Sequence, residues 1–340
     1  MRTSWLVALT AAITALTITG AAQAPAGRAA YTPPKTAWGD PDLEGVWPST
    51  AMVGVPLERA KQFGTRLYLT DAEFTARQSD AAKQAALDTL DFDIEKPPAE
   101  IKALGDVGNE TSPPPHWLER GEPSRQSSLV VDPADGVIPP YTPDGQARQR
   151  LAKTTYIKQT GFSSPDELGP YDRCISRGVV GSMLPVVYNN GNRIIQSPGY
   201  VVIQNEMIHE ARIVPLDGRG ALPKSFTSYM GDSRGSWEGN TLVVRTTNLN
   251  GVNGLQANGQ LMLTSNALEL VEKFTRTAAD TMQYEVTITD PRTWGRPWTM
   301  SYPLKADREY QMFEYACHEG NYSMRNTLSG SRADEKGSAR

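Results

Sequence analysis

Short segments of alternating polarity, separated by turns, fill the second half of the sequence. Seven of them lie between residues 193 and 318, and the breaks carry turn-forming runs such as NNGN, LDGRG and WEGN. Alternation of polar and apolar residues is typical of a β-strand with one buried face. Consecutive strands with short connections favour antiparallel pairing. We therefore expect a mainly β protein built on an antiparallel up-and-down, lipocalin-like β-barrel at residues 171–328, with a β-sandwich as the alternative.

Residues 25–170 do not show this alternation, because prolines and turn-forming residues interrupt most of this region. Proline removes a backbone donor and restricts the residue before it, which disfavours long regular elements. A glycine-x-tryptophan strand at 45–47 is nevertheless a lipocalin-type feature. We expect residues 25–170 to form a partly helical extension that wraps the barrel, and residues 329–340 to form a disordered tail.

We expect two or three helices in this extension, and the sequence marks the start of two of them. Thr70 and Glu73 have the spacing of a capping box, and the alanine-rich run after them predicts a helix to about Leu90. Thr142 followed by Pro143 predicts the start of a second helix, which continues through PDGQARQRLAKTTYIK.

The N-terminus has the layout of a secretory signal peptide at residues 1–24. Arg2 precedes an apolar run, and Ala22-Gln23-Ala24 is a small-x-small cleavage pattern. The alternative is a single membrane anchor. Cleavage after Ala24 would leave an exported protein, periplasmic or secreted, without an integral membrane segment, because no later run is long and apolar enough to span a bilayer.

The charge and the cysteine content limit which classes of partner and cofactor we expect. The formal net charge is −4 and both signs are mixed along the chain, so we expect no nucleic-acid partner. Cys174 and Cys317 are the two cysteines, and in an exported protein the pair predicts one disulfide, with two free thiols as the alternative. Three histidines, no C-x-x-C pair, and no Walker, dinucleotide or haem motif lead us to expect neither metal nor cofactor.

Polar residues interrupt one predicted inward face. In VVIQNEMIHEARIVPLDG, a strand period of two places Asn205 and His209 on the same face as their apolar neighbours, the residues Val201, Ile203, Met207, Ala211 and Ile213. A polar side chain that points into a barrel needs a partner or a ligand. A satisfied core histidine is the alternative for His209.

Glu272 lies on a similar face, with Leu268, Leu270 and Phe274. Burial would raise the pKa of such a carboxyl group, which suits a general acid or base. The alternative is solvation at a strand end or pairing with an arginine. Tyr284 shares a predicted inward face with Met282, Val286 and Ile288, where it either donates to the same cavity or is ordinary core packing.

The disulfide would bring two further residues together. Arg173 and His318 each adjoin one of the cysteines, so together they could bind a carboxylate or another anion at the rim. The alternative is an ion-pair and hydrogen-bond cluster that locks a C-terminal strand at residues 309–318.

These residues suggest a pocket for an apolar or aromatic small molecule. Its predicted walls are Val201, Ile203, Met207, Leu270, Phe274, Tyr284 and Val286. Within it, His209 is the candidate base, Glu272 its acid or base partner, Asn205 the group that orients the substrate, and Tyr284 a donor to developing negative charge. Such a set predicts a cofactor-independent lyase, isomerase or cyclase. A lipocalin-like carrier and a structural envelope protein are the alternatives, and the substrate and oligomeric state stay open.

Several long motifs in the sequence resemble those of a known protein family. The segments GYVVIQNEMIHEARIVPLDG, GDSRGSWEGNTLVV and EYACHEGNY, with DPDLEGVW near the N-terminus, resemble those of a family of exported bacterial proteins of uncharacterised function. The resemblance extends over most of the mature chain. It implies export and an independent globular unit, and it assigns no catalytic residue.

Overall fold

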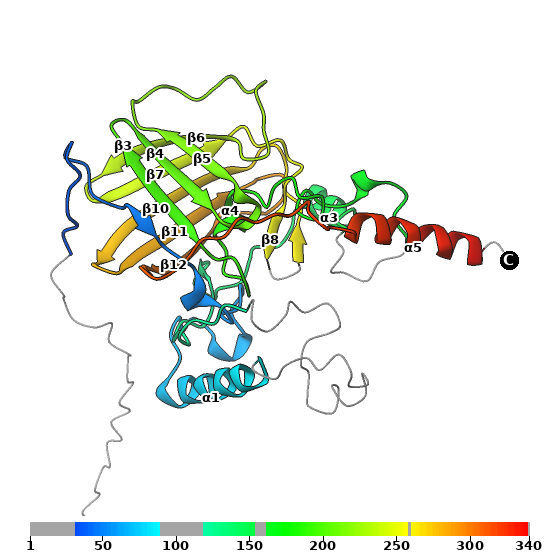
Figure 1. Ribbon diagram of the computed structural model, residues 1–340, viewed down its shortest axis with the longest axis horizontal. Coiled ribbons are helices and arrows are strands. Elements are labelled where there is room, and N and C mark those ends of the chain that lie inside the picture. The colour runs from blue at the N-terminus through cyan, green and yellow to red at the C-terminus, as the bar shows by residue number, and fades with distance from the viewer. Residues whose placement is uncertain (1–30, 89–117, 154–160, 258–259, 339–340) are drawn as a thin grey trace, which may run out of the picture. The chain divides into compact units, whose positions relative to one another are not determined.

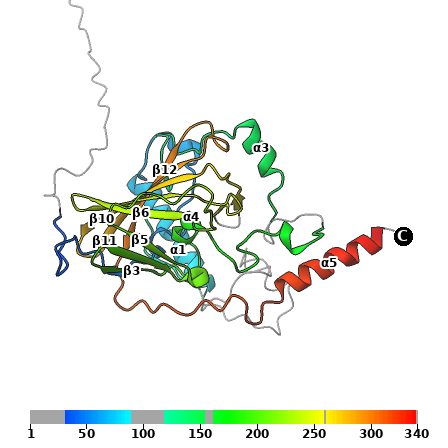
Figure 2. The same ribbon diagram turned by 90° about the horizontal axis from the view of Figure 1, so that it is seen from above.

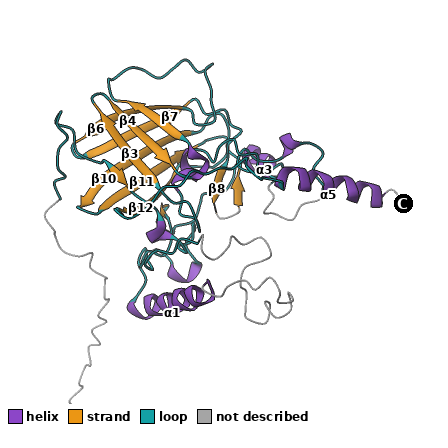
Figure 3. Ribbon diagram, viewed as in Figure 1, coloured by secondary structure: helices purple, strands orange, loops and turns teal. Residues whose placement is uncertain are grey.

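Antiparallel strands dominate the computed structural model, which describes residues 31–88, 118–153, 161–257 and 260–338 (Figure 1, Figure 3). The mainly β, antiparallel class is therefore confirmed. Among the described residues one sheet has the order β1(Gly45–Val46), β3(Asn192–Ser197), β4(Tyr200–Asn205), β5(Ala211–Pro215). The other has the order β2(Val130–Asp132), β12(Trp298–Lys305), β11(Thr281–Thr289), β10(Glu269–Ala278), β7(Thr241–Thr247), β6(Asp232–Glu238). A small hairpin pairs β8(Leu255–Ala257) with β9(Gln260–Met262).

The two larger sheets enclose one hydrophobic core. Alternate residues of β11 are buried, as are Val201 and Ile203 of β4, and all of them belong to the same cluster. Figure 2 shows β3 below β10, so the sheets form separate layers. No closed barrel forms among the described strands, because no ladder joins β5 to β6. The chain between those strands is a long loop rather than a tight turn, which leaves both as sheet edges.

The prediction of one continuous strand at residues 200–216 is wrong. The segment 200–216 forms two strands, β4 and β5, which pair as an antiparallel hairpin around the short 3-10 turn η5(Met207–His209). Within this turn Ile208 and His209 have positive φ angles of 60° and 46°. The turn reverses the chain and shifts the alternation by one residue, so Ile213, predicted to face inward, is 65% exposed.

The N-terminal half contributes to both sheets. β1 pairs with β3, and β2 pairs with β12, so residues Thr32–Arg340 form one compact unit that crosses the boundary predicted at residue 170. Trp47, which follows β1, is buried, and the guanidinium carbon of Arg276 lies 5.4 Å from its ring centroid.

The two predicted helix starts coincide with observed helices. α1(Asp71–Asp88) follows the capping box, in which the Thr70 amide donates to Glu73 Oε2 at 2.8 Å and the Glu73 amide donates to Thr70 Oγ1 at 3.4 Å. α3(Pro143–Gln149) begins at Thr142, whose Oγ1 accepts from the Gly145 amide at 3.0 Å. α3 is shorter than predicted, and residues 154–160 lie outside the described part of the chain.

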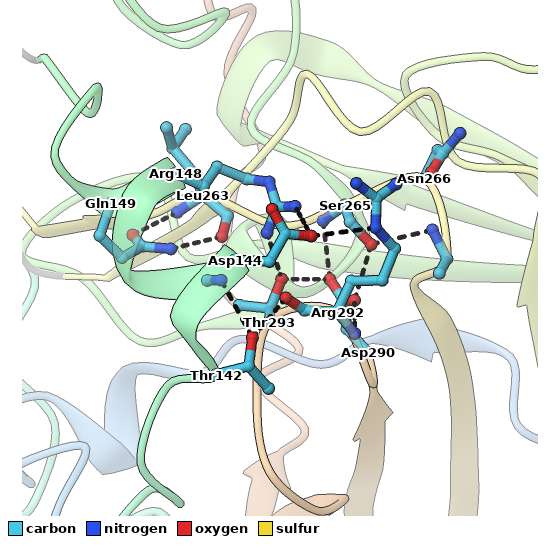
Figure 4. Close-up of polar contacts among 12 residues, drawn as sticks. Thr142, Asp144, Arg148, Gln149, Leu263, Ser265, Asn266, Asp290, Arg292 and Thr293 are labelled. Atoms are coloured by element: carbon cyan, nitrogen blue, oxygen red, sulfur yellow. Dashed lines mark hydrogen bonds and ion pairs between the residues drawn. The ribbon is translucent and has the colours of Figure 1, made fainter.

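Figure 4 shows how α3 docks on the connection between β11 and β12. The Thr142 hydroxyl donates to the Arg292 carbonyl, and the side chain of Gln149 exchanges two hydrogen bonds with the Leu263 backbone. A Cβ on Gly145 would lie 2.3 Å from the Thr293 carbonyl oxygen, so only glycine permits this approach. The extension is thereby fixed to the second sheet.

The C-terminal part departs from the sequence prediction. Residues 306–322, expected to include a strand, have no regular strand or helix, and α5(Ser323–Ser338) occupies most of the predicted disordered tail. In Figure 2 the chain after β12 passes β3 on its way to α5. The remaining described helices are η1(Thr50–Met52), η2(Lys61–Phe63), η4(Pro165–Glu167) and α4(Val179–Met183). Over the described ranges, no helix combines the length and the apolar character needed to cross a membrane. The predicted signal peptide lies outside them.

Candidate functional site

Glu272 is buried, as the sequence predicts, and it is paired with an arginine. Arg212 donates from its two terminal nitrogens to the two carboxylate oxygens at 2.6 and 2.9 Å, and the Tyr284 hydroxyl donates to Glu272 Oε1 at 3.0 Å. Burial works against the charge of Arg212, but attraction to Glu272 outweighs it, so the pKa of the guanidinium is raised. Burial raises the pKa of Tyr284 well above its ordinary value. A continuous strand through this segment would place Arg212 on the face opposite to Ala211 and Ile213, and the η5 turn accounts for its inward position.

This ion pair joins the two sheets across the core. Arg212 lies on β5 and Glu272 on β10, and their relative exposures are 4% and 0%. A carboxylate with both oxygens bound by one guanidinium is geometrically fixed and fully compensated. The structure therefore brings Glu272 and Tyr284 together in the core, where they hold the two sheets.

Asn205 is buried at the end of β4 and binds across to β3. Its Nδ2 donates to Asn192 Oδ1 at 2.7 Å, and Asn192 in turn donates to the carbonyls of Trp47 and Asn190. Asn192 thereby links the inner face of this sheet to the chain just after β1.

The predicted apolar walls form part of the protein core. Val201, Ile203, Leu270, Phe274, Tyr284 and Val286 all belong to the shared hydrophobic cluster, and Met207 is also buried. None of them lines the pocket described next.

A pocket of about 370 Å³ lies at the end of the β3–β4 pair, beneath the segment of residues 306–317, which we call the strap. From the sheet and the η5 turn it is lined by Arg193, Gln204, Asn205, Glu206 and His209. From the strap it is lined by Met312, Phe313 and Glu314. Two of the predicted catalytic residues, Asn205 and His209, thus share one pocket, and Glu272 and Tyr284 lie elsewhere.

His209 is exposed on the η5 turn rather than directed into the core. The expectation of an inward histidine is therefore wrong, since the strand ends at Asn205. His209 Nδ1 lies 3.0 Å from the Tyr315 carbonyl oxygen on the strap. A carbonyl oxygen only accepts, so Nδ1 carries a proton, and in the neutral ring Nε2 is the proton acceptor.

Glu206 anchors the strap. The strand period of two would place it on the face opposite to Asn205, yet it is buried, and its carboxylate accepts four hydrogen bonds. The donors are Asn189 Nδ2, the Gly191 amide, the Phe313 amide and the Tyr310 hydroxyl, at 3.1, 3.1, 2.8 and 2.7 Å. Four donors compensate the buried charge without a cation.

Tyr310 also reaches a second carboxylate. Its hydroxyl lies 2.9 Å from Glu119 Oε1, and Glu119 accepts in addition from the backbone amides of Asn189 and Asn190. Burial raises the pKa of Tyr310, and the hydrogen bond to Glu206 adds to this effect. A Cβ on Gly191 would lie 2.7 Å from Glu206 Oε2, so a side chain there would displace the carboxylate that anchors the strap.

The predicted disulfide is confirmed and fixes the end of the strap. Cys174 and Cys317 are bonded, with their Cα atoms 5.7 Å apart. Of the two residues beside the cysteines, Arg173 makes an ion pair with Asp166 at 3.1 Å and His318 is exposed, and neither lines the pocket beneath the strap.

Six of the eight residues that line the pocket were not predicted as site residues: Arg193, Gln204, Glu206, Met312, Phe313 and Glu314. Arg193 and Gln204 are paired in register on adjacent strands, and their place on the outward face follows from the alternation of β3 and β4. The strap covering that face has no local signal, since it depends on a disulfide and on Glu206. Across the described ranges, no group of three or more acidic, histidine or cysteine residues is arranged to hold a metal ion.

The chain matches no protein-family model, no curated protein and no solved structure.

Proposed function

We propose that this is an exported, cofactor-independent enzyme that performs acid–base chemistry on a small apolar or aromatic molecule in the pocket beneath the strap. The carrying observation is the hydrogen bond from His209 Nδ1 to the Tyr315 carbonyl, which leaves Nε2 as the base. A histidine held in one tautomer beside a cavity is suited to taking a proton from a substrate. The export part of the proposal rests on the signal-peptide pattern of residues 1–24.

The other lining groups support this role. Arg193 supplies positive charge where negative charge develops as the proton leaves, and Met312 and Phe313 supply apolar surface for the substrate body. His209 then returns the proton to another atom in an isomerisation or cyclisation, or to a leaving group in an elimination. In this proposal Glu272, Tyr284 and Asn205 support the scaffold.

A lipocalin-like carrier is the second proposal. It is supported by the glycine-x-tryptophan feature, since Trp47 is buried at the first strand and lies under Arg276. A carrier would bind its ligand in the same pocket and release it unchanged.

The test is an incubation of the disulfide-bonded mature protein with a panel of apolar and aromatic metabolites, with products and retained ligands followed by mass spectrometry. His209→Ala should lower turnover by roughly 100-fold or more, because general-base catalysis contributes about that factor. His318→Ala is the matched control, since His318 is exposed and outside the pocket. Turnover that survives His209→Ala contradicts the role of His209 as the base, and a retained ligand without any product in the wild type contradicts the enzyme proposal and supports the carrier.

A further inference from the structure

Two opposite charges on different walls of the pocket have no partner among the described residues. Arg193 projects from β3 and Glu314 belongs to the strap, and both line the pocket. Neither side chain makes a hydrogen bond or ion pair with any residue in the described part of the chain, the other one included. Charged groups that face a cavity without a partner are available to a ligand.

The third charged group in the pocket is already occupied. Glu206 accepts four hydrogen bonds from the protein, two of which come from Tyr310 and Phe313 on the strap. The available charges are therefore one guanidinium and one carboxylate. A purely anionic ligand would meet Glu314 and a purely cationic one would meet Arg193, so each would face like charge. A ligand that carries both charges complements both walls.

The rest of the lining limits the size and polarity of that ligand. Met312 and Phe313 present apolar surface from the strap, next to Glu314 in the sequence. A volume of about 370 Å³ lies near the lower end of the range for small-molecule sites. The pocket therefore suits one compact molecule with an apolar or aromatic group.

We propose that the pocket binds a free α-amino acid with an apolar or aromatic side chain. Its carboxylate pairs with Arg193, its ammonium group pairs with Glu314, and its side chain packs against Met312 and Phe313. This proposal deepens the proposed function, since it rests on the same pocket, but it concerns binding and requires no turnover.

The experiment measures binding of three matched probes to the disulfide-bonded protein by calorimetry. L-Phenylalanine carries both charges, 3-phenylpropanoate lacks the ammonium group, and 2-phenylethylamine lacks the carboxylate. L-Phenylalanine should bind about tenfold or more tightly than either analogue, because each loses one charge-assisted contact.

Variants assign each charge to its partner. Arg193→Gln should abolish the preference for L-phenylalanine over 2-phenylethylamine and keep the preference over 3-phenylpropanoate. Glu314→Gln should show the reverse pattern. Arg245→Gln is the matched control, since Arg245 is exposed on β7 and lies outside the pocket. Unfolding temperatures should stay within a few degrees in all three variants, because the substituted side chains are exposed.

The proposal is overturned when the three wild-type affinities are equal, when none of the probes binds, or when the preferences persist in both pocket variants. The His209→Ala variant distinguishes failure of this binding proposal from failure of the proposed catalytic function. Binding preferences that survive in this variant while turnover is lost support both proposals. Turnover that survives in it contradicts only the catalytic role of His209.

Discussion

Two buried glutamates show how differently a fold can compensate a carboxylate. Glu272 is bound by one guanidinium and a phenol, whereas Glu206 is bound by two amides of the main chain, an asparagine and a phenol. The first arrangement places a charged partner in the core and locks two sheets together. The second uses neutral donors from the strap and from the 189–191 turn. It therefore ties these two irregular segments to the end of β4.

Removal of Glu272 should be among the costliest single substitutions in this protein. Glu272→Ala leaves Arg212 buried without its counter-charge, and breaking a buried pair in this way costs about 3–5 kcal/mol of unfolding free energy. Arg212→Met combined with Glu272→Leu and Tyr284→Phe removes every member of the cluster and should recover most of that loss. Urea unfolding with the disulfide intact measures both variants. A triple variant no more stable than Glu272→Ala would contradict this account.

The buried position of Glu272 could be predicted from its sequence, but that of Glu206 could not. Glu272 lies within β10, a ten-residue strand in which Leu270, Glu272 and Phe274 alternate as buried positions. Glu206 follows directly after β4, where alternation no longer applies, and its donors come from parts of the chain far away in sequence. Local pattern fixes the face of a strand residue, whereas the surroundings of a turn residue depend on tertiary contacts.

At the scale of elements, strands were predictable where they are long and their polar and apolar residues alternate. The segments that became β7, β10, β11 and β12 coincide with predicted strands. The strand predicted at residues 309–318 does not form, because the alternating residues of the strap pair with no described strand. Instead, the backbone of Phe313 and Tyr315 binds the side chains of Glu206 and His209. An alternating pattern predicts an extended chain, and pairing requires a free strand edge beside it.

The strap should loosen when its tyrosine anchor is removed. Tyr310→Phe keeps the ring but deletes the hydroxyl shared by Glu206 and Glu119. A hydrogen bond to a charged group contributes about 1.5–3 kcal/mol, so the Phe313 amide should exchange with deuterium roughly 10- to 100-fold faster. Hydrogen exchange followed by mass spectrometry of strap peptides measures this effect.

Tyr322→Phe is the control, because Tyr322 is 63% exposed and lies beyond the strap. It should leave the exchange of the strap unchanged. Equal exchange in the wild type and in Tyr310→Phe would show that the hydroxyl has no anchoring role and that the other contacts of the strap hold it.

For the whole molecule, the chain is held together by contacts between distant parts of the sequence. β1 and β2 come from the N-terminal half and complete the two sheets, while the strap returns from β12 to the end of β4. The Cys174–Cys317 bond closes a loop with a sequence separation of 143 residues at the strap's far end. The pocket depends on this closure, since three of its lining residues lie between Tyr310 and Cys317.

Loss of the disulfide should therefore affect both stability and the pocket. In the chain-entropy model a crosslink over a loop of this length contributes roughly 5 kcal/mol, so Cys174→Ser with Cys317→Ser should lower the unfolding temperature by about 10 °C. The strap would then be held mainly through Glu206 and His209, and L-phenylalanine binding should weaken in parallel. Calorimetry measures both, and a reductant added to the wild type should reproduce the result but leave the variant unchanged. An unfolding temperature equal to that of the wild type would mean that the packed sheets, and not the crosslink, determine the stability of the molecule.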